Sequence, residues 1–152
     1  MDKEELLRRY AAGERDFSGV FLRWLDFSDC DLSGINLSNA DLESTEWEGA
    51  NLSGANLSGA FLAYSGLNNA NLTEANLSRA RLQDCTLSGA NLTDACVREA
   101  IFGNEPHLVG ANLTGVDLSQ ARIDLPGGID NPRIADVILC DTTLPNGENW
   151  TI

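Results

Sequence analysis

A large apolar residue occupies every fifth position of this chain from Phe17 to Phe102, without interruption. Neither an α-helix, with about 3.6 residues per turn, nor a β-strand, with a repeat of two, produces this spacing. A chain that returns a large residue to the core every five residues must turn a corner in every unit. The pattern therefore predicts a solenoid of five-residue repeats. Its eighteen centres are Phe17, Leu22, Phe27, Leu32, Leu37, Leu42, Trp47, Leu52, Leu57, Leu62, Leu67, Leu72, Leu77, Leu82, Leu87, Leu92, Val97 and Phe102.

The positions around each centre are small or polar. Two residues before the centre the chain usually has Ala, one before it Asn or Asp, and after it Ser or Thr followed by Gly. The small and the large residue are expected to point inward, and the other three to face water. One such unit cannot bury itself, but stacked units bury a continuous core.

The phase of the repeat slips once. After Phe102 the centres continue six residues on, at Leu108, Leu113, Leu118 and Ile123. The extra residue lies in the segment 103–107, where Pro106 lacks a backbone donor and suits a bulge. A solenoid absorbs such an insertion at a corner, so we expect the coils to continue beyond it, to twenty-two repeats in all.

The residues before the repeats predict a helix over 2–12. Asp2 can cap it, with Glu5 completing a capping box, while Leu6, Leu7 and Tyr10 form its apolar stripe. We expect this helix to cover the first coil.

After residue 125 the repeat pattern is lost. The segment 126–152 is predicted to cap the last coil, with a tail that folds back along one side as an alternative. The expected organisation is an N-terminal helical cap over 1–14, repeats over 15–125 and a C-terminal cap or tail over 126–152.

The repeat resembles that of the pentapeptide-repeat proteins, whose motif A(D/N)LXX recurs as Ala50-Asn51-Leu52-Ser53-Gly54 and Ala90-Asn91-Leu92-Thr93-Asp94. The match spans Arg15 to about Leu125. The resemblance implies an all-β fold, a right-handed quadrilateral β-helix with four repeats in each coil. Twenty-two repeats then give five to six coils, with the helical cap at the N-terminus.

With twenty residues per coil, positions twenty apart stack vertically. The residue before the centre then forms two columns of stacked amides, expected to hydrogen-bond along the stack. The first amide column comprises Asn36, Asn56 and Asn76, and the second comprises Asn51, Asn71, Asn91 and Asn112.

A third side concentrates outward apolar residues, which we call the aromatic face: Phe21, Trp24, Phe61, Tyr64 and Ile101. Aromatic residues are enriched at protein interfaces, and exposed apolar patches are rarely left uncovered. Three occupants are weighed: the C-terminal tail with Ile134, Val137, Ile138 and Trp150, a second copy of the chain, or a foreign protein. The sequence favours a non-enzymatic protein-interaction scaffold.

An alternative function comes from the acids. Between Trp24 and Ser78 the chain has eight Asp and Glu but no Lys or Arg. We call six of these the acidic face: Asp26, Asp29, Asp41, Glu43, Glu46 and Glu48. Family members that protect a topoisomerase are acidic rods that occupy its DNA-binding groove, so the resemblance admits a DNA mimic that binds a DNA enzyme such as gyrase. The simpler interpretation is that the charge keeps a rod soluble.

The net charge of −13 argues against nucleic-acid and anionic-membrane partners, which need clusters of Lys and Arg. No apolar run reaches membrane-spanning length, and the first residues do not form a signal peptide. We expect a cytoplasmic protein.

Chemistry for catalysis is sparse in this sequence. His107 is the single histidine and has no neighbouring ligand set, so no metal, cofactor or small-molecule substrate is expected, and the chain is not expected to be an enzyme. Cys30 and Cys85 occupy small inward positions. Cys96 and Cys140 are expected to stay reduced, or to pair if the tail folds back.

Overall fold

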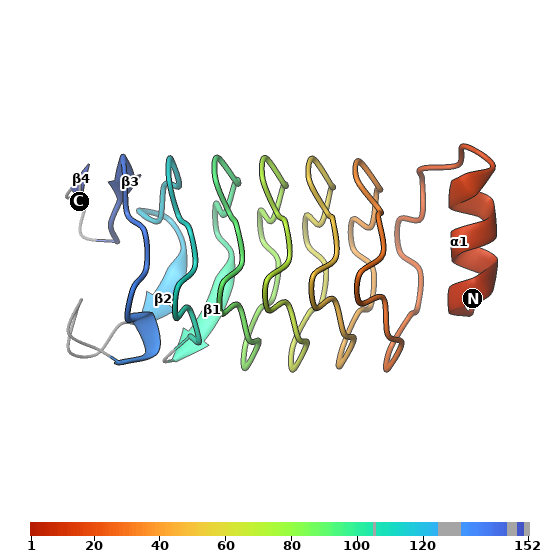
Figure 1. The fold of residues 1–152 in the computed structure, drawn as a ribbon, viewed down its shortest axis with the longest axis horizontal. Coiled ribbons are helices and arrows are strands. Elements are labelled where there is room, and N and C mark those ends of the chain that lie inside the picture. Colours follow the sequence, from red (N-terminus) through yellow and green to blue (C-terminus); the bar gives the residue numbers. More distant parts are fainter. Residues whose placement is uncertain (105, 125–131, 146–148, 151–152) are drawn as a thin grey trace.

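The structure is a computed structural model, and it describes residues 1–104, 106–124, 132–145 and 149–150. The chain winds into a straight shaft of stacked coils, with a helix α1 (Lys3–Ala11) at one end and the C-terminus at the other (Figure 1). The core lies inside the shaft, so every functional side chain must project from one of its sides.

Backbone pairing repeats every twenty residues. Parallel bridges join Asp16 to Asn36, Asn36 to Asn56 and Asn56 to Asn76, and the same spacing recurs on the other sides. A coil of twenty residues that turns every five has four sides. Each side stays extended for too few residues to form a long strand, so most pairing consists of single bridges.

One repeat shows why the motif has its composition. In the unit 35–39, four of the five backbone N–H groups donate to backbone carbonyl oxygens. One of these acceptors is the Leu32 carbonyl in the preceding turn, and the other three carbonyls belong to neighbouring coils. The fifth, that of Ser38, donates to the side-chain oxygen of Asn36 at 3.1 Å. Asn or Asp before the centre therefore completes the backbone hydrogen bonding of its own turn.

The core consists of the predicted centres and the small residues before them, almost all fully buried. Trp47 stacks on Phe27 with ring centroids 4.6 Å apart. The indole N–H of Trp47 donates to the hydroxyl of Thr45 at 2.7 Å, and the hydroxyls of Thr45 and Ser65 both donate to the Leu42 carbonyl. These buried polar groups are thus satisfied within the core.

The N-terminal helix starts and ends within a residue of its expected range. The Asp2 carboxylate accepts a hydrogen bond from the Glu5 N–H at 2.8 Å. The Glu5 carboxylate pairs with Arg8, so the reciprocal half of the predicted capping box is replaced by a surface ion pair. Leu6 is fully buried, and the Tyr10 hydroxyl donates to the Ser33 carbonyl at 2.7 Å, which fixes α1 to the coils beside it.

The extra residue enters between Ile101 and His107, where the spacing of the bridges changes from twenty to twenty-one residues. Strand β1 (Ile101–Asn104) pairs in parallel with β2 (Arg122–Asp124), with a register shift between Ile101 and Gly103. On the next side His107 pairs with Thr86 at a spacing of twenty-one residues.

The stacking extends beyond residue 125. A short helix η2 (Pro132–Ile134) precedes bridges from Asn112 to Ile138 and from Asp117 to Thr143. Ile134 and Leu139 are buried in the same core as the repeats. The segment 132–143 therefore lengthens the shaft and does not fold back along one of its sides.

The last described strands run in opposite directions. Strand β3 (Thr142–Thr143) pairs antiparallel with β4 (Asn149–Trp150), whereas the bridges along the shaft are parallel. Because β4 is reversed, it ends the parallel stacking on this side.

The four cysteines are free thiols, including Cys96 and Cys140. Cys85 is buried and donates to the Leu62 carbonyl, and burial raises the pKa of this thiol to about 12. Over the residues that the structure describes, no helix has the length and apolar character needed to cross a bilayer.

Candidate functional site

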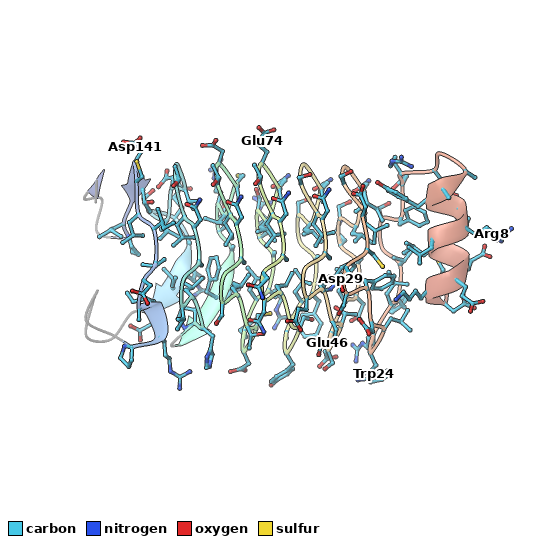
Figure 2. All side chains as sticks on the ribbon, viewed as in Figure 1. Arg8, Trp24, Asp29, Glu46, Glu74 and Asp141 are labelled. Atoms are coloured by element: carbon cyan, nitrogen blue, oxygen red, sulfur yellow. The ribbon has the colours of Figure 1, made fainter. Side chains whose placement is uncertain are left out.

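The aromatic face is assembled by the twenty-residue stacking. Bridges align one column before the centres, in the order Phe21, Asp41, Phe61, Arg81 and Ile101. Phe21, Trp24 and Tyr64 expose 74%, 75% and 60% of their surface, whereas Phe61 and Ile101 are half-buried. Figure 2 shows Trp24 projecting from one edge of the shaft near α1, opposite the edge that carries Glu74 and Asp141.

Two of these aromatic residues have an unusual backbone conformation. Trp24 and Tyr64 have φ values of 61° and 62°, in the left-handed region. The equivalent corners of other repeats carry Gly54 and Gly59, with φ values of 64° and 67°. A bulky side chain is disfavoured in this region, and glycine is not, so these corners bear aromatic residues at a cost in stability.

Two turns of the same face also lack the side-chain acceptor. Asn51 and Asn56 each accept a hydrogen bond from the backbone N–H two residues later, at 3.2 Å. Phe21 and Phe61 occupy the equivalent position and have no side-chain oxygen to accept such a bond. The aromatic face departs from the repeat where the repeat would stabilise the fold, which is expected of functional positions.

Charged residues lie between the aromatic side chains. The Arg23 guanidinium pairs with the carboxylates of Asp41 at 2.7 Å and Glu43 at 2.6 Å, and this raises the pKa of Arg23. The Arg81 guanidinium lies over the Phe61 ring, 4.9 Å from its centroid. The sequence already places Asp41 and Arg81 between the aromatic residues, one full coil before and after Phe61, whereas Arg23 and Gln83 were missed.

The C-terminal segment does not cover this face within the described residues. Ile134 is buried in the core, Val137 packs against it, and Ile138 joins the column of Asn112. Phe21, Trp24 and Tyr64 are exposed with this segment in place. The side chain of Trp150 lies outside the described part of the chain.

The acidic face is split by the structure. Asp41 and Glu43 belong with the aromatic face through their pairing with Arg23. Asp26 and Glu46 are bridged on the next side of the shaft. The other four members of the acidic face, Asp26, Asp29, Glu46 and Glu48, are exposed.

Hydrogen bonds from Ser28 lower the pKa of Asp26, so this carboxylate also serves its own turn. Asp29 and Glu46 lie in the same half of the shaft as Trp24 (Figure 2). The Asp26 column continues to Gly66 and Thr86, so its acidic part extends over two coils.

The amide columns form largely as expected. The Asn56 amide donates to Asn36 at 3.0 Å, and the Asn71 amide donates to Asn51 at 3.1 Å. Asn91 and Asn112 continue the second column through backbone bridges. These two sides stabilise the stack and carry the regular motif.

Other candidate chemistry is scattered. His107 is exposed, and its Nε2 lies 2.6 Å from the Arg133 guanidinium. A polar hollow of about 410 Å³ lies beside Arg79, Arg98 and Glu99, where Arg79 pairs with Glu99 at 2.9 Å. Within the described ranges no cluster of three potential metal ligands is present.

Comparison with known proteins gives one matching family model and several similar solved structures. A family model described as pentapeptide repeats matches residues 35–65 and 67–104 in 8 copies. A pentapeptide repeat protein from the thylakoid lumen of Arabidopsis thaliana is 29% identical, with a TM-score of 0.54 over 68% of each chain. No curated protein matches the chain.

Two further solved structures are more distant in shape. A pentapeptide repeat protein from Nostoc PCC 7120 is 28% identical, with a TM-score of 0.44 over 82% of this chain and 88% of its own. QnrB1, a plasmid-mediated fluoroquinolone resistance protein, is 25% identical, with a TM-score of 0.31 over 80% of this chain and 63% of its own.

The matched repeats and the parallel coils agree with the fold implied by these relatives, a right-handed β-helix. The sequence, the stacking and the thylakoid-lumen structure agree: residues 35–65 and 67–104 are pentapeptide repeats, and the chain resembles pentapeptide-repeat proteins.

Proposed function

We propose that this protein is a non-enzymatic scaffold that binds a protein partner through its aromatic face. The proposed scaffold has five to six coils of repeats, with α1 as the N-terminal cap. Its cytoplasmic location, expected from the sequence, is part of the proposal and agrees with the four free thiols.

One observation carries the proposal: Phe21, Trp24 and Tyr64 are 60–75% exposed on a single side of the shaft. Trp24 and Tyr64 replace the corner glycine, and Phe21 and Phe61 replace the Asn or Asp acceptor, that stabilise the regular sides. Exposed aromatic residues retained at a cost in stability are typical of interfaces.

The test is a double substitution, Phe21→Ser with Tyr64→Ser. Both side chains are mostly exposed, so the thermal unfolding midpoint should change little, whereas binding should fall at least tenfold. Binding is measured by capture from a cell extract on the immobilised protein and by the concentration dependence of its mass in light scattering.

Glu74→Ser is the matched control, because Glu74 is also an exposed corner residue with a positive φ, on the opposite edge of the shaft (Figure 2). It should leave both readouts unchanged. If the double variant binds and associates like the wild type, the aromatic face is not the interaction surface.

A second candidate function rests on Asp26, Asp29, Glu46 and Glu48, which are exposed together at the N-terminal half of the shaft. Such a surface can occupy a basic groove that otherwise binds DNA, so a DNA enzyme such as gyrase is the candidate partner. The acidic part of the Asp26 column extends over only two coils, so we rank this function below the first.

Neutralising this surface tests the second candidate. The triple variant Asp26→Asn, Glu46→Gln and Glu48→Gln keeps the size of each side chain. If the proposal holds, the wild type alters gyrase supercoiling at low salt, and the effect is lost in the variant and in higher salt. An effect that is equal for the two proteins excludes charge mimicry.

A further inference from the structure

We propose that the aromatic face binds a second copy of this chain in antiparallel orientation, with the two-fold axis at the level of Phe61. The inference rests on the proposed function and names the partner. It comes from the order of side chains along the face. When a second copy is turned end to end against the first, each apolar residue faces an apolar residue and each charged residue of the column faces one of opposite charge.

The column of Phe61 has this property along its whole length. It reads Phe21, Asp41, Phe61, Arg81 and Ile101, at equal spacings of one coil. When a second copy is inverted about Phe61, the two Phe61 residues, each with Arg81 beside its ring, lie opposite each other, and Phe21 meets Ile101. Each Asp41 then faces Arg81 of the other copy, so symmetry makes two ion pairs beside an apolar centre.

The neighbouring column agrees with the same axis. It contains Arg23, Glu43, Ala63, Gln83 and Gly103, of which Ala63 would face itself. Glu43 would face Gln83 across the axis. The Gln83 amide nitrogen can donate to the Glu43 carboxylate, and Arg23 would lie over the small Gly103.

Within each copy, one negative charge near Asp41 is left without a partner and can pair across this contact. Asp41 and Glu43 share the single guanidinium of Arg23, so one negative charge in this group is uncompensated. Arg81 lies over the Phe61 ring and places its charge next to the proposed axis. An ion pair formed beside an apolar centre is screened less than one in open solvent.

A parallel pair is disfavoured by the same residues. A two-fold axis that runs parallel to the shaft over the neighbouring column would set this column on itself, with Glu43 against Glu43 and Arg23 against Arg23. Like charges placed directly opposite each other oppose association. The antiparallel order avoids such contacts in both columns.

The area of the aromatic face limits the expected affinity of the dimer. At about 4.8 Å per coil, Phe21 and Ile101 are about 19 Å apart along the shaft. One side of this length falls below the roughly 1,200 Å² that stable interfaces bury, so the dimer should be weak and reversible, with a Kd on the order of 10–100 μM.

A charge exchange tests the pairing. In Asp41→Lys the two ion pairs become repulsions, and in Arg81→Glu the opposite repulsions arise. Neither variant should dimerise alone, whereas an equimolar mixture should form a heterodimer, because each new charge then meets its opposite. Sedimentation equilibrium from about 5 μM to 500 μM measures this, with circular dichroism to verify that each variant folds.

The control exchanges the same charges on another side. Arg79→Glu and Glu99→Lys alter an exposed ion pair beside the polar hollow, and each should dimerise like the wild type. If Asp41→Lys and Arg81→Glu dimerise alone as well as the wild type does, or if their mixture stays monomeric, the antiparallel pairing is wrong.

Cysteine cross-linking tests the register independently, in a background with Cys30, Cys96 and Cys140 replaced by Ser. Phe61→Cys should cross-link to itself, because it lies on the axis. Phe21→Cys should cross-link only when Ile101→Cys is also present. Cross-linking of Phe21→Cys to itself would instead indicate a parallel pair and would overturn the proposal.

The two proposals fail in different ways. A wild type that stays monomeric to 500 μM and gives no cross-link overturns the second copy as the partner. The aromatic face remains an interaction surface in that case if Phe21→Ser with Tyr64→Ser still abolishes capture from the extract. If that double variant loses neither capture nor self-association, both proposals are wrong.

Discussion

At the scale of single residues, most corners of the shaft impose a left-handed backbone on the residue that occupies them. Corners carry Gly at several positions and Asn or Asp at others, all of which tolerate this conformation. Trp24 and Tyr64 tolerate it poorly. Their presence is better explained by what they contact outside the chain than by the fold.

Replacing Tyr64 with glycine should therefore separate stability from binding. Tyr64→Gly relieves a strained corner, so the free energy of unfolding should stay constant or rise by up to about 1 kcal/mol, while association weakens. Urea unfolding and light scattering measure the two quantities. Glu74→Gly, at a corner with φ of 58°, should show a similar stability change without weaker association. A clear loss of stability in Tyr64→Gly alone would mean that the tyrosine packs in the folded monomer.

The turn carboxylates predict a dependence on acid. Hydrogen bonds from serine lower the pKa values of Asp16, Asp26 and Asp117. A lowered folded-state pKa contributes stability above the unfolded pKa of about 3.9, and this contribution is lost as the pH falls through the folded-state value. The stability should thus decline below about pH 4.

Asp26→Asn should weaken that decline, because the amide oxygen accepts the same bond without titrating. Thermal unfolding of both proteins between pH 2 and pH 7 tests this. The variant should match the wild type at pH 7 and exceed it in acid. Curves that stay parallel over the whole range would show that Asp26 does not contribute through its charge.

At the scale of elements, α1 lies at one end of the stack and packs against it through Leu6. Leu6 is fully buried and Leu7 only partly. Leu6→Ala should cost about 2–5 kcal/mol at this end, and Leu7→Ala considerably less. Because coils contact only their neighbours, the loss should be local.

Amide hydrogen exchange shows whether the loss of stability is confined to the coils next to α1. In Leu6→Ala the amides of Phe17 and Leu22, which bond to the next coil, should exchange faster. The Leu77 amide, which bonds to Cys96 in the middle of the shaft, should keep its protection. Equal loss of protection at all three would show that the shaft unfolds as one cooperative unit.

The elements also show which features can be predicted from sequence. The period of five locates the buried centres and the amide columns, because burial and stacking act within one repeat and its neighbour twenty residues away. The position of the segment 132–143 was harder to predict from the sequence. Its stacking depends on the burial of Ile134 and Leu139 in the core, and these residues follow a stretch in which the five-residue period is lost. The site was predictable in its aromatic members but not in the pairing of Arg23 with Asp41 and Glu43, which depends on side-chain conformation across coils.

At the scale of the whole molecule, the net charge of −13 is carried by a narrow rod, so its carboxylates repel one another. Raising NaCl from about 10 mM to 150 mM at pH 7 should screen this repulsion and raise the unfolding midpoint by a few degrees, or about 1 kcal/mol. The same titration near the isoelectric pH of 4.2 should have a smaller effect. A midpoint that falls with salt at pH 7 would show that ion pairs such as those of Arg23 outweigh the repulsion.

The bridges between residues twenty apart have a consequence for engineering. Over the uninterrupted coils, any outward position has its vertical neighbours one coil before and one coil after, at about 4.8 Å. The surface is thus a regular grid in which sequence number alone gives the coordinates of each side chain. Substitutions at outward positions of the two regular sides could place rows of chromophores, catalytic groups or metal ligands at a chosen spacing, without a new backbone design.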